Sequence, residues 1–213
     1  MKITWFGQSC FLLETHTISI VTDPYDSQIG LKLPTDLHAD IVTVSHQHMD
    51  HNNTAAVIGE PKIISDTGTI TIKEVVCEGI TSFHDDEQGK KRGQNIIFKF
   101  SLEGINIAHL GDLGHMLTDT QLSLLGHVDI LLIPVGGSYT IDGVVAAAIV
   151  QQLQPTITIP MHYGITGLGF PLEPVESFTK NVSLPVRTQN TLEITKDSLP
   201  KKAEIVVLQP AIQ

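Results

Sequence analysis

Three histidines and an aspartate stand within six consecutive residues, in the pattern HxHxDH: His46, His48, Asp50 and His51. They directly follow the apolar run 41–44, so four candidate metal ligands leave the end of a buried strand together. Side chains at i and i+2 of an extended segment project the same way, so the first two histidines can face one point. The aspartate and the last histidine, on the turn that follows, can face a second point. Two metals about 3.5–4 Å apart can use all four groups, so the spacing indicates two-metal chemistry rather than a structural zinc.

Four ligands do not complete two metal shells, so further histidines or acids must come from elsewhere in the chain. Three candidates stand just beyond apolar runs that resemble strands: His84, Asp112 and His162. The alternative reading is that the clustered histidines are solvated loop residues. Histidines and a carboxylate this close together are typical of metal sites, and we therefore favour the metal.

The elements that must position these residues are mostly short strands. Apolar runs rich in β-branched residues predict strands at 3–6, 11–13, 18–21, 41–44, 62–64, 79–83, 96–102, 105–110, 130–133, 156–159 and 204–208. Helices are expected after Asn53 or Thr54 up to Gly59, at 118–125, and at 141–153, the last opened by Thr140 or Asp142. Two similar halves of this kind predict two mixed sheets packed face to face, with helices on both outer faces.

Composition limits the class of protein. The chain has 213 residues, which fits a single domain over residues 1–213. Its 13 Lys and Arg against 23 Asp and Glu give a net charge of −10, which argues against nucleic acid as the main partner. The amino-terminal residues lack the unbroken apolar stretch of a secretory signal, and no run approaches the roughly 18 residues of a membrane span. A cytoplasmic protein with a small-molecule substrate is expected, and homo-oligomer formation is left open.

The two cysteines indicate neither a zinc ribbon nor a disulfide framework. Cys10 and Cys77 lie far apart, without CxxC or paired spacing, which fits a reducing compartment. We expect both to be small buried core residues, because unpaired cysteine behaves as a hydrophobe.

These motifs together resemble those of a known family. An HxHxDH motif followed by a later histidine, an aspartate in a Gly-Asp pair and a late histidine is the ordered signature of the metallo-β-lactamase fold. The segments ITWFGQSCFLLE, HLGDLGH, PVGGSYTID and IPMHYG resemble the branch of metal-dependent hydrolases that includes ascorbate phosphate lactonase-like proteins. The resemblance extends from the first expected strand to about residue 170.

The resemblance implies an α/β (α+β) fold, the four-layer αββα sandwich, with a dinuclear centre. It implies that one metal is bound by His46, His48 and His84, that the other is bound by Asp50, His51 and His162, and that Asp112 bridges them. A hydroxide usually shares such a bridge, because two cations lower the pKa of bound water from about 15.7 toward about 7 or below. Zinc is the favoured metal, with manganese or iron as alternatives. Neither cysteine occupies a ligand position, so antibiotic hydrolysis is not favoured.

Other polar residues near the motifs are candidates for catalysis. Asp50 is expected to act in catalysis as well as in metal binding. His115, three positions after Asp112, could donate a proton to the leaving group; the alternative is a polar loop residue that hydrogen-bonds the backbone. Asp23 or Asp142 could accept a hydrogen bond from a metal-bound histidine, although Asp142 could equally serve as a helix N-terminal carboxylate.

Further residues are candidates for substrate contact or for the core. Arg92 in the segment GKKRGQN could contact a substrate phosphate, with a charged hairpin tip as the alternative. Tyr139 and Tyr163 could shape a substrate pocket, with a buried aromatic residue of no such purpose as the alternative. His109, by strand alternation, is expected to be a packed or hydrogen-bonded residue of the sheet.

Three functions remain open at this level. The leading one is a hydrolase in which a hydroxide between the metals attacks the carbonyl or phosphoryl centre of a small, anionic lactone, ester or phosphodiester. A nuclease is the second, opposed by the net charge. An iron-binding redox protein with the same ligands is the third.

Overall fold

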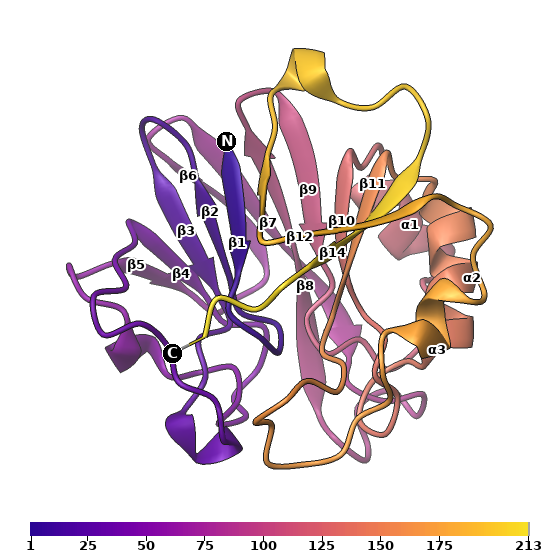
Figure 1. Ribbon diagram of the computed structural model, residues 1–213. Helices are drawn as coiled ribbons and strands as arrows, with labels where there is room; N and C mark the ends of the chain where they lie inside the picture. Colours follow the sequence, from indigo (N-terminus) through magenta and orange to yellow (C-terminus); the bar gives the residue numbers. More distant parts are fainter. Residues whose placement is uncertain (213) are drawn as a thin grey trace.

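The computed structural model describes residues 1–212 as two mixed β-sheets packed face to face (Figure 1). The six-stranded sheet has the order β13-β1-β2-β3-β4-β5 and the eight-stranded sheet the order β12-β14-β11-β10-β9-β8-β7-β6. The strands of the first are β1 Lys2–Trp5, β2 Phe11–Glu14, β3 Ser19–Thr22, β4 Ile41–Thr43, β5 Lys62–Ile64 and β13 Thr191–Glu193. Those of the second are β6 Gly68–Ile72, β7 Val75–Phe83, β8 Gln94–Leu102, β9 Ile105–His109, β10 Ile130–Pro134, β11 Ile157–Met161, β12 Val186–Gln189 and β14 Glu204–Leu208.

Aromatic and β-branched side chains fill the space between the sheets. Trp5 and Phe11 of the first sheet and Phe98 and Phe100 of the second are fully buried in one cluster. The Phe11 ring meets the edge of the His109 ring across the interface, with centroids 6.1 Å apart. His109 is itself buried and donates from Nε2 to the Ser9 carbonyl, 2.9 Å away, which confirms it as a hydrogen-bonded residue of the sheet.

Three helices cover the outer face of the eight-stranded sheet (Figure 1): α1 Asp119–Leu125, α2 Gly143–Leu153 and α3 Glu176–Thr179. The first two confirm predictions made from local capping signals. Thr118 and Gln121 form a capping box at α1, and the Asp142 carboxylate accepts from the first two amides of α2 after Gly143.

The outer face of the six-stranded sheet is covered differently from the expectation. The segment after Asn53 forms only the 3₁₀ turn η2, Thr54–Ala56, and a second such turn, η1, spans Ser27–Ile29. Asn53 makes no side-chain cap, and the Ile58 amide bonds the Leu37 carbonyl, so the chain becomes extended before a helix can propagate. Loop residues around η1 and η2 pack here in a second apolar cluster, which includes Cys10.

Several strands were not predicted. β6, β12 and β13 were absent from the expected set, and β7 begins at Val75 rather than at 79. The side chains of β6 and β12 are exposed or half-buried, so they carry little apolar periodicity. Within residues 1–212, no helix combines the length and apolarity needed to cross a membrane.

Both cysteines are free and buried, as predicted. Burial and the nearby Asp23 raise the pKa of the Cys10 thiol well above its usual value. Burial and the nearby Glu78 raise the pKa of Cys77, on β7 in the main core, to about 12.

Candidate metal centre

The predicted ligands meet at one end of the sandwich because the strands that carry them end there. The HxHxDH turn follows β4, His84 follows β7, Asp112 lies beyond β9, and His162 directly follows β11. β7, β9 and β11 run parallel to one another within the eight-stranded sheet, so their carboxyl ends share one edge. The ligands come from both sheets, so the centre forms only when the two sheets pack together.

A glycine allows Asp112 to approach the other ligands. Gly111 has φ +56°, and a Cβ at this position would lie 2.3 Å from Asn95 Oδ1 and 2.7 Å from Ser45 Cβ. The same Asn95 Oδ1 accepts from the Asp112 amide at 2.9 Å. A larger residue at position 111 would therefore displace Ser45, which precedes the HxHxDH motif, and Asn95, which holds the Asp112 amide.

The seven predicted ligands form two adjacent groups. His46, His48 and His84 offer ligand atoms within 4.8 Å of one another, and so do Asp50, His51, Asp112 and His162. Asp112 connects the groups: its Oδ2 lies 3.2 Å from Nε2 of His84 in the first group, and 3.2 Å from Nε2 of both His51 and His162 in the second.

The residues present fit metal ions. Nε2 of His46 and Nε2 of His51 are buried and meet no acceptor or donor with hydrogen-bond geometry within residues 1–212, although His51 Nε2 lies 3.2 Å from the Asp112 carboxylate. A buried polar atom normally has a partner, because leaving it unpaired costs about 1–3 kcal/mol. Unpaired imidazole nitrogens beside buried carboxylates are the donor set that divalent transition metals bind.

Asp23 contacts two residues of the cluster region, Ser45 and His51. Its carboxylate lies 3.0 Å from His51 Nδ1 and accepts from the amide and the hydroxyl of Ser45 at 2.7 and 2.6 Å. This fixes the tautomer that leaves His51 Nε2 free to face the ligands. The prediction that Asp23 or Asp142 contacts a ligand histidine is therefore met by Asp23, whereas Asp142 caps α2.

Sequence reasoning missed two residues of the turn between β1 and β2. The buried Gln8 amide Nε2 lies 3.2 Å from both Asp50 Oδ2 and His162 Nε2, and Ser9 Oγ donates to Asp112 Oδ1 at 3.3 Å. Gln8, Asp23 and His162 all have positive φ, from 42° to 51°, a conformation that costs energy for residues with a side chain. In the sequence, Gln8 and Ser9 are recognisable only as part of a short Gly-Gln-Ser turn between two apolar strands. Such a turn does not indicate that its side chains point toward the candidate ligands.

A pocket of about 530 Å³ opens beside the cluster. Its lining includes His48, Asp50, His84 and Asp112, together with Gln28, Ile29, Gln47, Met49, Arg92, Tyr139 and Phe170. Arg92 and Tyr139 thus lie where substrate contact was predicted. Tyr163 does not: its buried ring packs on Trp5 with centroids 5.0 Å apart, and it lines a different cavity, because the chain turns at His162 and directs the next side chain into the core.

Comparison with known proteins identifies the family. The family model of the β-lactamase superfamily domain matches residues 2–162. A crystal structure from Thermotoga maritima, described as a Zn-dependent hydrolase of the metallo-β-lactamase superfamily, superposes with a TM-score of 0.82 and 42% identity over 97% of both chains. The chain belongs to the metallo-β-lactamase superfamily.

Curated relatives in the same superfamily agree. A UPF0173 protein of Pyrococcus abyssi is 32% identical over 79% of this chain and 86% of its own length. A UPF0173 metal-dependent hydrolase of Thermoplasma acidophilum is 30% identical over 76% of this chain and 83% of its own. The protein is therefore a metal-dependent hydrolase, as predicted, and the metallo-β-lactamase fold is confirmed. The likeness to the ascorbate phosphate lactonase branch stays a prediction.

The histidine pKa values differ between the two groups of candidate ligands. Burial, with a smaller contribution from His51, lowers the pKa of His46 to about 3. Burial also opposes the charged form of His162, but the adjacent Asp112 carboxylate outweighs it and raises the pKa of His162 to about 9. Burial likewise opposes ionisation of Asp112, and His162 and His51 nevertheless lower its pKa well below the usual value. Without metal, the second group is thus held together by imidazolium–carboxylate pairs.

His115 lies beside the cluster with both ring nitrogens engaged by the backbone. Nε2 accepts from the Phe83 amide at 3.2 Å, and Nδ1 donates to the Met116 carbonyl at 2.7 Å. This arrangement favours the backbone-bonding alternative, in which His115 holds the end of β7 in place. Its role in catalysis stays a prediction.

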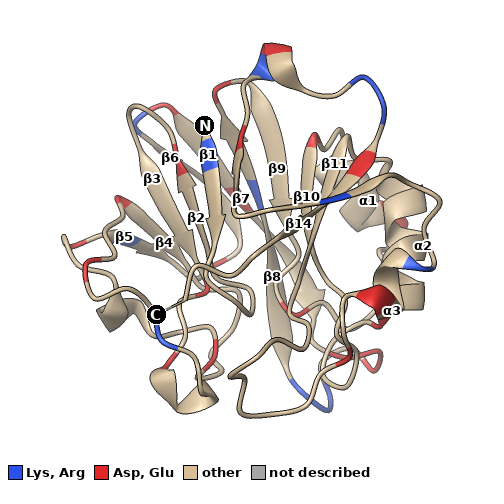
Figure 2. Cartoon of the chain, viewed as in Figure 1, with Lys and Arg blue, Asp and Glu red and all other residues tan. Residues whose placement is uncertain are grey.

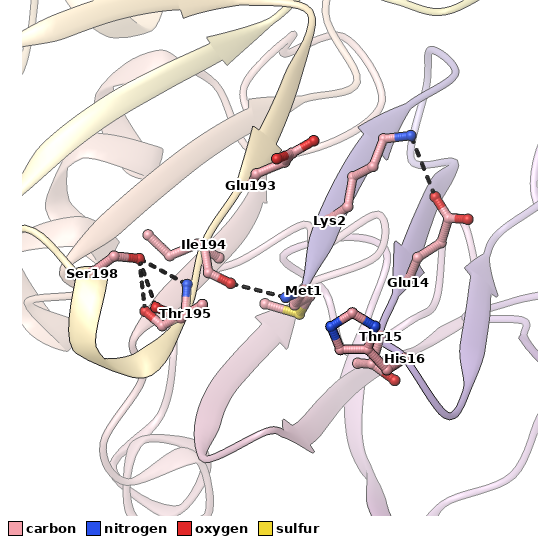
Figure 3. Close-up of a pocket in the computed structure, with 9 residues that line it drawn as sticks. All are labelled: Met1, Lys2, Glu14, Thr15, His16, Glu193, Ile194, Thr195 and Ser198. Carbon is pink, nitrogen blue, oxygen red and sulfur yellow. Dashed lines mark hydrogen bonds and ion pairs between the residues drawn. The ribbon is translucent and has the colours of Figure 1, made fainter.

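A separate pocket of about 520 Å³ lies at the start of β1 (Figure 3). Among its lining residues, Lys2 pairs with Glu14, and the Met1 ammonium donates to the Ile194 carbonyl. β1 runs parallel to β4 through the intervening strands, so its start is at the opposite end of the sheet from the ligands. This pocket therefore takes no part in the metal centre.

Proposed function

We propose that the protein is a dinuclear hydrolase that cleaves a small, anionic substrate at a carbonyl or phosphoryl centre, as in a lactone, an ester or a phosphodiester. One observation carries the proposal: Asp112 Oδ2 lies at 3.2 Å from histidine nitrogens of both ligand groups, the position of a bridging ligand. Two separate mononuclear sites would not need this shared carboxylate.

The distances between the ligand atoms divide the residues between two cations. His46, His48 and His84 would hold one, Asp50, His51 and His162 the other, and Asp112 both. Zinc suits this mixture of imidazole and carboxylate, with manganese or iron as alternatives. When bound, such cations supply an activated water nucleophile at neutral pH and polarise the oxygen of the bond to be cleaved.

The chain itself supplies orientation and a proton acceptor. Asp50 is 17% exposed, whereas Asp112 is 2% exposed, so Asp50 is the carboxylate that substrate and water can reach. Gln8 bonds Asp50 at Oδ2, and Asp50 Oδ1 makes no hydrogen bond within residues 1–212, which leaves that oxygen open to water or substrate. Burial opposes ionisation of Asp50, but His51 and His162 lower its pKa well below the usual value, so the group is a carboxylate and could take a proton only transiently.

The wider expectations fit this activity. The net charge of −10 supports a small molecule rather than nucleic acid as the substrate. Two free, buried cysteines fit a reducing compartment and support a cytoplasmic enzyme.

The test is a paired measurement of metal content and turnover. The purified protein should contain about two divalent ions per chain and should hydrolyse at least one class among chromogenic lactones, esters and phosphodiesters. Asp50→Ala should lower kcat/KM by about 100-fold or more, because it removes both a ligand and a proton acceptor. Asp36→Ala, on an exposed loop carboxylate, is the matched control. Turnover that is indifferent to Asp50→Ala would refute the mechanism, and iron with oxygen uptake but no hydrolysis would favour the redox alternative.

A further inference from the structure

The loop after His84 is closed by one carboxylate. Asp85 Oδ1 accepts from the amides of Glu87 and Gly89 at 2.8 and 2.9 Å. Its Oδ2 accepts from the amides of Lys91 and Arg92 at 2.9 and 2.8 Å. Four charge-assisted hydrogen bonds to one side chain fix the backbone from which Arg92 projects. The basic segment is therefore the connection of the β7–β8 hairpin, as the alternative expected, and its backbone is fixed by Asp85 (Figure 2).

Arg92 lines the pocket and contacts the loop on its other side. Its guanidinium lies 4.9 Å from the centroid of the Tyr139 ring and donates to the Ser138 carbonyl at 3.2 Å. The Tyr139 ring in turn meets the Phe170 ring edge-on, with centroids 5.7 Å apart. Arg92 therefore joins two loops that flank the ligands.

The charge of Arg92 is not neutralised. No carboxylate pairs with it among residues 1–212, although the chain carries ten more acidic than basic residues. Its neighbour Lys91, by contrast, pairs with Glu87 at 2.7 Å and with Asp86 at 3.6 Å. An ordered arginine without an acidic partner keeps its planar donors available for a carboxylate or phosphate.

Apart from Gln28, Gln47 and Tyr139, the rest of the pocket wall is apolar or belongs to the candidate metal centre. Ile29, Met49 and Phe170 form a hydrophobic side, and Met49 is 46% exposed. Among residues 1–212, Arg92 is the one Lys or Arg that lines this pocket. A substrate is thus offered three kinds of contact: the metal centre, one fixed cation and a hydrophobic surface.

We propose that Arg92, held by Asp85 and Tyr139, recognises an anionic group of the substrate separate from the bond that is cleaved, while Ile29, Met49 and Phe170 bind an apolar portion. The substrate class is then an amphipathic acid: an ester, lactone or phosphoester that also carries a carboxylate or phosphate. This inference rests on the proposed hydrolytic function and adds to it the feature that selects the substrate.

The experiment compares two esters of equal chain length, mono-p-nitrophenyl glutarate, which carries a free carboxylate, and neutral p-nitrophenyl valerate. Arg92→Gln should raise KM for the glutarate ester about 10–100-fold, since one charge-assisted contact is lost, while kinetics with the valerate ester change little. Arg92→Lys should recover part of the loss, because it keeps the charge without the planar fork. Lys91→Gln is the matched control, as it removes the same charge from the same loop.

The outcomes separate this inference from the proposed function. If wild type hydrolyses both esters and Arg92→Gln affects them equally or not at all, substrate recognition by Arg92 is wrong and the hydrolase remains. If wild type hydrolyses neither ester, titration calorimetry with phenylphosphonate, a non-hydrolysable amphipathic anion, decides. Weaker binding by at least about tenfold in Arg92→Gln than in Lys91→Gln supports recognition by Arg92, and equal binding, or no binding to wild type, refutes it.

Discussion

His162 combines a strained backbone with a position between two carboxylates. Its φ is +51°, and its Nε2 lies 3.2 Å from Asp112 Oδ2 and 3.8 Å from Asp50 Oδ2. Histidine is among the residues that tolerate the left-handed conformation better than β-branched ones. The fold therefore places this residue at some energetic cost, which is expected where a side chain serves a site rather than stability.

Replacing His162 should affect one cation more than the other. In His162→Ala, about one of the two metal equivalents should be lost, because the first group of histidines stays intact. Elemental analysis after dialysis against a weak chelator measures this, with the exposed His38→Ala as the control. Full retention, or loss from the control as well, would contradict the assignment of His162 to the second group.

Metal binding should release protons. In the metal-free protein Asp112 raises the pKa of His162, against the effect of burial, from 6.5 to about 9, so the ring is protonated at pH 7. A cation must displace that proton, so affinity should increase as pH rises from 6.5 toward 9. The stabilisation that the imidazolium gives the metal-free fold is complete below pH 6.5 and is lost over the same interval. Titration calorimetry in two buffers of different ionisation enthalpy measures the released protons, and a pH-independent affinity would refute the assignment.

At the scale of elements, the loop 85–92 is organised around one side chain, that of Asp85, which accepts from four of its amides. Burial opposes ionisation of Asp85, but the four amides that it accepts from lower its pKa to about 2. In Asp85→Asn the charge is lost, and the amides of Glu87, Gly89, Lys91 and Arg92 should exchange with solvent deuterium about tenfold faster or more. Asp86→Asn, on the exposed neighbour, should leave these rates unchanged. Equal exchange in the two variants would show that other contacts order the loop.

Elements with local signals were predictable, and those that depend on distant partners were not. Thr118 with Gln121, and Asp142 alone, mark the starts of α1 and α2 within one turn of each helix. β13, by contrast, is a strand because β1 pairs with it from the other end of the chain. The predicted helix after Asn53 is absent for a similar reason, because the Ile58 amide donates to the carbonyl of the distant Leu37 instead of forming a helical hydrogen bond.

At the scale of the whole molecule, the convergence of the candidate ligands was predictable because each of them follows an apolar strand. Two packed sheets bring such strand ends together, so position along the chain implied position in space. What lies around the ligands was less accessible. The contact of Gln8 with Asp50 and the side-chain contacts of Arg92 with Ser138 and Tyr139 join residues that lie far apart in sequence. For Tyr163 the structure shows the buried-aromatic alternative, because its ring packs on Trp5, which the sequence alone does not indicate.

The two buried cysteines give the molecule a pair of internal reporters. Cys10 lies beneath the loops that cover the six-stranded sheet, and Cys77 lies on β7 of the other sheet. Since a protonated, covered thiol does not react with alkylating reagents, each can be modified only when its own surroundings open. Mass spectrometry of the two peptides after timed alkylation would therefore give separate opening rates for the loops over the six-stranded sheet and for the core between the sheets, without any introduced label.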